Sequence, residues 1–183
     1  KLEKHDLNKI DSLYWRNPDL NFKNIDALIT SLEKKTDNEF LRRINECEDE
    51  KVLKLLVKND ETLKSKYSEE LIKTLWECCQ IPDFSKKAYG KHIEIVKKVF
   101  EFLSSKSGKV TNDYMKKQLE DLDRYDGNID TVANRISSVR TWSYVANKKN
   151  WASNADYWIE RTKYIEDKLS DKLHEELTKS FVD

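Results

Sequence analysis

The chain has 183 residues, enough for one domain or for two small domains that share a core. Only three glycines and two prolines occur beside 38% hydrophobic and 37% charged residues, which argues against sandwiches and barrels because those folds need frequent tight turns. Lys plus Arg (34) equals Asp plus Glu (34), so no global charge draws the chain to nucleic acid or membrane, and any such contact must come from a local patch.

Short helices are predicted over the first third of the chain. Weak helical periodicity in the opening residues ends before Pro18, as the restriction on residues that precede proline requires. Apolar residues then recur at helical spacing over residues 25–32, 40–44, 52–56 and, less regularly, 63–67. Helices of about ten residues are not stable alone in water, so each must pack on a neighbour.

Longer helices with clearer boundaries follow. Ser68 is placed to cap a helix over residues 69–79, which has acids in its first turn and stops before Pro82. Residues 93–103 carry an apolar stripe, and residues 104–108 form the plainest linker in the chain. Thr111 is placed to cap the next helix, which is expected to end near Gly127.

The last two helices are the most regular. One is predicted over about residues 130–146, and a loop holding Trp151 leads to Ser153 or Asn154 as the cap of the other. That final helix is the longest, and its apolar stripe steps by seven or four through Trp158, Ile165, Leu169, Leu173 and Leu177. We therefore expect an all-α fold, a multi-helix bundle of about eight to nine helices with a long C-terminal helix and no sheet. Residues 1–67 are expected to be a connecting segment of short helices, and residues 68–183 a helical bundle domain.

Motifs for phosphate handling are missing from the sequence. Neither GxxxxGK[ST] nor GxGxxG occurs, and Gly90, Gly108 and Gly127 lie too far apart in sequence to build either. We therefore expect that this chain does not itself bind and hydrolyse ATP, and we assign it no catalytic and no cofactor-binding residue.

Metal and disulfide patterns are also weak. The three cysteines include an adjacent pair, Cys78 and Cys79, but no CxxC, so we predict reduced thiols and neither a zinc site nor a disulfide framework. An EF-hand glycine at Gly127 would put Leu122 at the first ligand position, where it supplies no oxygen, and a helix-ending turn is the better interpretation. His174 has no second histidine four residues on, so no metal residue is assigned.

Two expectations concern the setting of the chain. No apolar run approaches the ~20 residues that cross a bilayer, so no membrane contact is expected. The chain opens at Lys1 rather than at a methionine, and we expect it to be a piece of a longer protein.

The densest candidate surface is a cluster of basic and aromatic residues near the C-terminus. Aromatic faces stack on unpaired bases and guanidinium groups bind phosphates, so these residues are candidates for nucleic-acid binding. The competing interpretation is structural, with the tryptophans in the core and the arginines paired to acids. The candidates are Arg135, Arg140, Trp142, Lys148, Lys149, Trp151 and Arg161.

Several strings resemble one protein family. LWECCQIPDF (residues 75–84), DGNIDTVANRISSVRTWSYVANKKNW (126–151) and WIERTKYIEDKLSDKLHEELTKSFVD (158–183) resemble the C-terminal region of superfamily-two ATP-dependent helicases. The relatives in question are the mitochondrial degradosome RNA helicase subunit and its bacterial counterparts. WRNPDLNF (15–22) and ALITSLE (27–33) resemble the segment that joins the second motor domain to that region.

The resemblance implies a function that the residues alone do not give. Two RecA-like motor domains, absent from this chain, would hold ATP and Mg, and the helical region would help to enclose a single strand of RNA or DNA. Its partners would be that strand and the motor domains of the same protein, in the bacterial cytoplasm or the mitochondrial matrix. The full-length protein would be an ATP hydrolase, whereas this chain alone would not be an enzyme. The alternative is a helical scaffold that docks other subunits through exposed aromatic residues such as Trp15 or Trp151.

Overall fold

The computed structural model describes residues 13–60, 67–84 and 89–182, and the chain divides into two compact units. Unit 1 is Lys1–Gln80 and unit 2 is Ile81–Asp183. The sequence predicts a boundary after residue 67, whereas the observed division follows Gln80. The difference arises because helix α4 (Glu69–Cys79) packs on helix α3 (Glu48–Asn59) and so belongs to unit 1.

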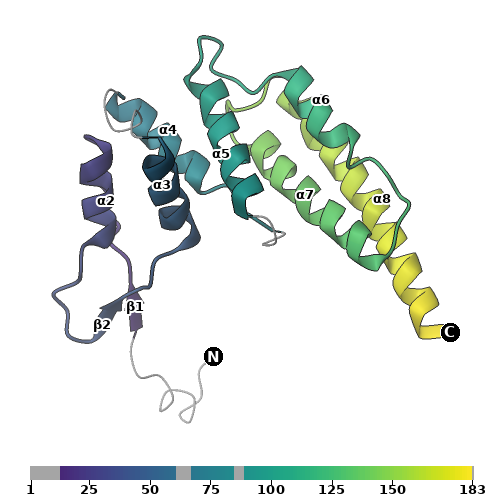
Figure 1. Ribbon diagram of the computed structural model, residues 1–183, viewed down its shortest axis with the longest axis horizontal. Coiled ribbons are helices and arrows are strands. Elements are labelled where there is room, and N and C mark those ends of the chain that lie inside the picture. Colours follow the sequence, from purple (N-terminus) through teal and green to yellow (C-terminus); the bar gives the residue numbers. More distant parts are fainter. Residues whose placement is uncertain (1–12, 61–66, 85–88, 183) are drawn as a thin grey trace. The chain divides into compact units, whose positions relative to one another are not determined.

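Three helices form the described core of unit 1 (Figure 1). Helix α2 (Ile25–Glu33) begins where the Asn24 side chain accepts a hydrogen bond from the Ala27 amide at 2.7 Å. The predicted cap at Ser68 is confirmed, since its hydroxyl accepts from the Leu71 amide at 3.3 Å. The apolar faces of α2, α3 and α4 bury Ile25, Leu28, Leu32, Val52, Leu53, Leu56, Ile72, Leu75 and Trp76.

A small parallel sheet was not expected. Strand β1 (Leu13–Trp15) pairs with strand β2 (Leu41–Arg43), with Leu13 opposite Leu41. The amide of Ile44 donates to the carbonyl oxygen of Trp15 at 2.8 Å and extends the pairing. The predictions of no sheet and of a helix over residues 40–44 are therefore wrong.

The reason lies in the local hydrogen bonds before β2. The Asn38 side chain accepts from the Phe40 amide at 2.9 Å, and the Thr36 hydroxyl accepts from the Asn38 amide at 3.2 Å. Such side-chain contacts offer the backbone an alternative to a helical turn. The chain therefore stays extended, and its backbone groups find partners in β1 instead.

Unit 2 is built around an antiparallel helix pair. Helices α7 (Ile129–Asn147) and α8 (Ala155–Val182) pack along each other, and α6 (Asn112–Glu120) lies beside α7 (Figure 1). Helix α5 (Tyr89–Ser104) completes the unit. The interior contains Val96, Val99, Phe100, Val110, Met115, Leu119, Val132, Ile136, Val139, Trp142, Val145, Trp158, Ile165 and Leu169.

The helix boundaries of unit 2 follow local signals. The predicted cap at Thr111 is confirmed, because its hydroxyl accepts from the Tyr114 amide at 3.2 Å. Asn128 caps α7 through the Thr131 amide at 2.9 Å. Asn154 stands directly before α8 with φ +59°, and its carbonyl oxygen accepts from the Tyr157 amide at 3.1 Å. Asn154, one of the two predicted residues, thus marks this helix start.

One end of unit 2 is tied together by a backbone bridge. The amide of Val110 donates to the carbonyl oxygen of Trp151 at 2.7 Å, and the amide of Ser153 donates to the carbonyl oxygen of Val110 at 3.0 Å. This bridge joins the α5–α6 connection to the α7–α8 connection.

The mostly helical fold and the long C-terminal helix are confirmed, since α8 spans 28 residues. Over the described residues the chain forms seven helices rather than eight or nine. The weakest predicted helix, residues 63–67, lies almost wholly outside them. No helix within the described ranges has the length and apolar character needed to span a membrane.

Candidate nucleic-acid interface

The two tryptophans of the predicted cluster are buried. Trp142 on α7 is 3% exposed and meets Tyr114 edge to face, with ring centroids 5.6 Å apart. Trp151, in the α7–α8 connection, is 5% exposed. A ring so enclosed offers almost no face to a base, so the placement of these two residues matches the structural interpretation.

Arg135 on α7 holds a loop rather than pointing into open solvent. Its guanidinium donates to the carbonyl oxygen of Arg124 at 3.1 Å and to that of Asp126. Its side chain is only 14% exposed and also approaches the Asp126 carboxylate, at 3.8 Å. The α6–α7 connection is therefore fastened to α7 through this residue.

The ion pairs made by Arg140 and Arg161 lie on opposite sides of α8. Arg140 Nε lies 3.4 Å from Glu166 Oε2, whereas Arg161 pairs with Asp123 of the α6–α7 connection. Each residue advances a helix by about 100°, so Glu166, midway between Tyr164 and Lys168, faces away from both. The predicted cluster is therefore split between two faces of the helix pair.

Lys148 and Lys149 lie where α7 ends. Lys148 is the C-cap residue, and its ammonium lies 5.6 Å from the centroid of the Trp151 ring. Lys149 beside it is exposed. Cations at this position interact favourably with the negative end of the helix dipole. The structure thus brings Lys148, Lys149 and Trp151 together and places Arg135, Arg140 and Arg161 elsewhere.

The surroundings of Arg161 are the richest in exposed aromatic and cationic groups. Its guanidinium lies 5.3 Å from the centroid of the Tyr164 ring and pairs with Asp123. The ammonium of Lys168 lies 4.4 Å from the Tyr125 ring centroid and 5.1 Å from that of Tyr164. Tyr125 in turn donates its hydroxyl hydrogen to the Asp123 carboxylate.

The surroundings of Tyr125 keep its phenol neutral. Burial and the hydrogen bond to Asp123 raise the pKa of Tyr125 above its ordinary value, so the phenol stays protonated and remains a donor. Asp123 therefore faces one cation, Arg161, and one neutral donor, Tyr125. A phosphate oxygen offers a guanidinium the same kind of contact as this carboxylate does.

The prediction from sequence missed most of these residues. Tyr125, Tyr157, Tyr164 and Lys168 were not among the candidates, although Tyr157 and Tyr164 are 53% and 49% exposed. The signal was available, because positions 157, 161, 164 and 168 share one helical face. Closeness in sequence selected Trp142 and Trp151 instead, and these pack inward.

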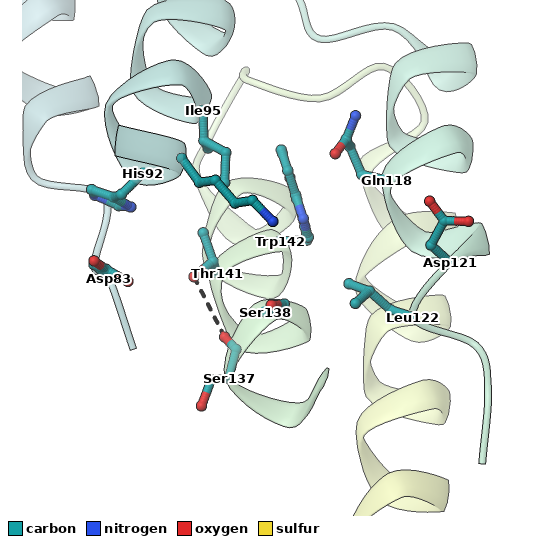
Figure 2. Close-up of a pocket in the computed structure, with 11 residues that line it drawn as sticks. Asp83, His92, Ile95, Gln118, Asp121, Leu122, Ser137, Ser138, Thr141 and Trp142 are labelled. Atoms are coloured by element: carbon teal, nitrogen blue, oxygen red, sulfur yellow. Dashed lines mark hydrogen bonds between the residues drawn. The ribbon is translucent and has the colours of Figure 1, made fainter. Parts of the chain in front are cut away.

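A separate polar cleft of about 300 Å³ lies within unit 2 (Figure 2). Its lining comprises Asp83, Lys91, His92, Ile95, Gln118, Asp121, Leu122, Ser137, Ser138, Thr141 and Trp142. In Figure 2 the side chains of Asp83 and His92 lie beside each other at one end, and Gln118 and Asp121 lie across the cleft.

Hydroxyl groups at this cleft are engaged by the backbone. Thr141 Oγ1 donates to the carbonyl oxygen of Pro82 at 3.1 Å, and Ser137 Oγ donates to that of Ala133 at 3.2 Å. An activated nucleophile needs its hydroxyl hydrogen directed at a base instead. The Thr141 contact therefore joins the chain before α5 to α7, whereas the Ser137 contact stays within α7.

The described residues contain no group of three or more His, Cys, Asp or Glu side chains placed to hold a metal ion. Cys47, Cys78 and Cys79 are free thiols. Burial raises the pKa of Cys79 well above its ordinary value, so this thiol is held in its unreactive protonated form.

No protein-family model, curated protein or solved structure matches this chain.

Proposed function

We propose that this chain is an accessory helical domain of an ATP-dependent RNA or DNA helicase, and that it contacts and guides a single nucleic-acid strand. Motor domains outside this chain would bind ATP and Mg and would supply the hydrolysis. The observation that carries the proposal is the pairing of the half-buried Arg161 with the exposed Tyr164 on α8, which offers a phosphate-binding group beside a ring face. The resemblance of residues 75–84, 126–151 and 158–183 to the helicase family supports it.

The domain would act passively. A strand held against a rigid helix pair cannot slide freely while motor domains open and close, so ATP turnover becomes directional travel. The close packing of α7 and α8 supports this role, because the contact surface belongs to a well-packed element.

Strand binding by the 183-residue chain tests the proposal. Fluorescence anisotropy with a labelled 12-nucleotide single strand should give a Kd of about 1–100 μM, the weak range expected from few phosphate contacts and no net charge. If two cations each engage one phosphate, the logarithm of affinity should fall with the logarithm of salt concentration with a slope of about −1.4. An absence of binding at 50 mM salt to any single-stranded RNA or DNA would remove strand guiding as the function.

A second candidate, a docking scaffold, has support in unit 1. Tyr14 and Leu13 on β1 are 68% and 58% exposed, and Phe40, directly before β2, is 74% exposed. Neighbouring exposed apolar side chains are typical of protein-binding surfaces. Trp151, one of the aromatic residues first considered for this role, is buried, and Trp15 is half-buried. Docking through this surface should be nearly insensitive to salt, which separates it from strand binding.

A further inference from the structure

One face of α8 carries an alternating row of rings and cations. Tyr157, Arg161, Tyr164 and Lys168 follow each other at intervals of four, three and four residues, which places all of them on one side of the helix. The row spans about 16 Å at 1.5 Å per residue. Its rings are about half exposed, and the Lys168 side of the row borders Tyr125. We call these four residues the α8 row.

We propose that the α8 row is the surface on which unpaired bases of a single strand stack, and that a backbone phosphate displaces the Asp123 carboxylate from Arg161 when the strand binds. This inference rests on the proposed function and specifies its contact surface. The partner it fits is single-stranded nucleic acid, RNA or DNA.

The row offers both groups that a single strand needs. Every base has a π face, so stacking on Tyr157 and Tyr164 tolerates any sequence, while Arg161 and Lys168 lie beside the rings to meet the phosphates. Cations next to a ring also attract its π electrons, and the centroid of the Tyr164 ring lies 5.3 Å from the Arg161 guanidinium and 5.1 Å from the Lys168 ammonium. The platform therefore exists before the strand arrives.

Asp123 occupies the place of a phosphate in the free protein. It accepts from Arg161 and from the hydroxyl of Tyr125, two donors that a phosphate oxygen also accepts from. Exchange of one anion for another leaves both donors satisfied, so the strand need not leave a buried donor unpaired. The cost is the loss of a partly exposed ion pair, which is modest.

Duplexes and acidic peptides fit this surface less well. A duplex hides the faces of its bases inside the stack and presents only phosphates, so the two tyrosines gain no partner. An acidic peptide meets Arg161 and Lys168 but likewise brings no planar rings. Stacking on the tyrosines is thus the property that distinguishes the three classes of partner.

The first experiment removes the rings one at a time. Tyr157→Ala and Tyr164→Ala should each weaken binding of a labelled 12-nucleotide single strand about fivefold or more, which is the lower end for loss of one stacked base. Tyr14→Ala, which removes an even more exposed tyrosine from unit 1, is the control and should leave affinity unchanged. Circular dichroism and melting curves should stay close to wild type, because all three rings are exposed.

The second experiment releases the guanidinium groups. Asp123→Asn frees Arg161 and should tighten strand binding about two- to fivefold, the range set by the strength of a partly exposed ion pair. Glu166→Gln removes the same charge and frees Arg140 on the far side of α8, about 10 Å away across the helix. That distance exceeds the Debye length of about 8 Å at 0.15 M salt, so this control should change affinity little.

Comparison of partners completes the test. The affinities for single-stranded RNA and for single-stranded DNA should both depend on Tyr157 and Tyr164. A duplex of equal length should bind more weakly, with an affinity that neither substitution changes. If single strands bind the wild-type chain but the tyrosine variants bind equally well, the α8 row is not the contact surface, while strand guiding survives. If no single strand binds at all, the proposed function itself fails. A polyglutamate peptide that displaces the strand equally from wild type and from both tyrosine variants would overturn stacking in favour of simple anion binding.

Discussion

Glu50 on α3 is 2% exposed although it carries a charge, and two cations enclose it. Arg43 donates to both of its oxygens at 3.1 Å, and Lys54 donates to one of them at 2.9 Å. Lys54 also reaches Glu46 at 2.7 Å and Glu33 at 3.3 Å. A buried carboxylate persists only when it is paired in this way, so the group links β2, α2 and α3 into one network.

The network makes unit 1 sensitive to acid. The hydrogen bond from Lys54 lowers the pKa of Glu46 below its usual 4.5. A carboxyl whose folded pKa is lowered contributes stability above its unfolded pKa, and that contribution disappears as pH falls through the folded value. Between pH 7 and pH 4 the free energy of unfolding, measured with urea, should fall more for the wild-type chain than for Glu46→Gln. Equal losses in both proteins would show that this carboxyl is not linked to folding.

Trp142 and Arg140 are near neighbours on α7 with opposite consequences. Trp142→Ala opens a cavity in unit 2 and should lower the free energy of unfolding by about 3–5 kcal/mol. Arg140→Ala removes only an exposed contact to Glu166 and should change it by less than about 0.5 kcal/mol. Urea unfolding followed by circular dichroism measures both. A Trp142 variant as stable as wild type would mean that the ring is not part of the core.

At the level of single elements, α8 is divided between a packed and an exposed portion. Trp158, Ile165 and Leu169 are buried, whereas Leu177 is exposed and Phe181 is 87% exposed. Ion pairs between turns, such as Lys172 with Glu176 at 3.0 Å and Lys179 with Glu175 at 3.2 Å, accompany the exposed portion. Ion pairs of this kind contribute little to the stability of a helix because solvent screens them.

Truncation of α8 should therefore reveal a sharp boundary. A chain that ends at Leu177 should keep the melting temperature of wild type within a few degrees, because it loses little buried surface. A chain that ends at Lys168 loses the fully buried Leu169 and should lose at least about 2 kcal/mol of stability. Melting curves by circular dichroism test both expectations. A large fall in melting temperature for the chain that ends at Leu177 would show that Phe181 packs against the protein.

The elements that sequence reasoning found are those with local signals. Ser68, Thr111 and the apolar periods of α5, α7 and α8 act within a few residues, so the helices could be predicted from neighbouring positions. Strands β1 and β2 were not predicted, because each has only three residues and depends on a partner far along the chain. Local sequence carries little information about such a pairing.

The candidate site was predicted less well for a similar reason. Closeness in sequence grouped Arg135, Arg140 and Trp142. Residues two positions apart on a helix, such as Arg140 and Trp142, nevertheless point to nearly opposite sides of it. Of all the predicted candidates, only Arg161 lies beside an exposed ring. Its partner Asp123, and the Tyr125 that donates to Asp123, come from a connection whose course depends on the packing of α6 and α7. Helical spacing would have found Tyr157, Tyr164 and Lys168, whereas the pairing with Asp123 needed the fold.

At the scale of the whole molecule, unit 2 has a core of its own. Residues from α5, α6, α7 and α8 supply its interior, among them Val99, Met115, Val139 and Ile165, which are 0% exposed. A protein made of residues 81–183 should therefore be helical, unfold cooperatively in urea and bind single strands with the affinity of the 183-residue chain. Non-cooperative unfolding would show that unit 2 needs unit 1 to fold, and a loss of affinity in a folded protein would implicate unit 1 in binding.

Two attachments hold connecting segments of unit 2 together, and the backbone bridge between Val110 and Ala152 is the stronger of them. At this bridge, separation of the α5–α6 connection from the α7–α8 connection requires that two main-chain hydrogen bonds break. The α6–α7 connection, which carries Asp123, is instead held to α8 through side chains, which rearrange within nanoseconds without melting a helix. Of the two attachments, the one through Arg161 therefore opens at lower cost, and it is the one that the proposed exchange of Asp123 for a phosphate would use.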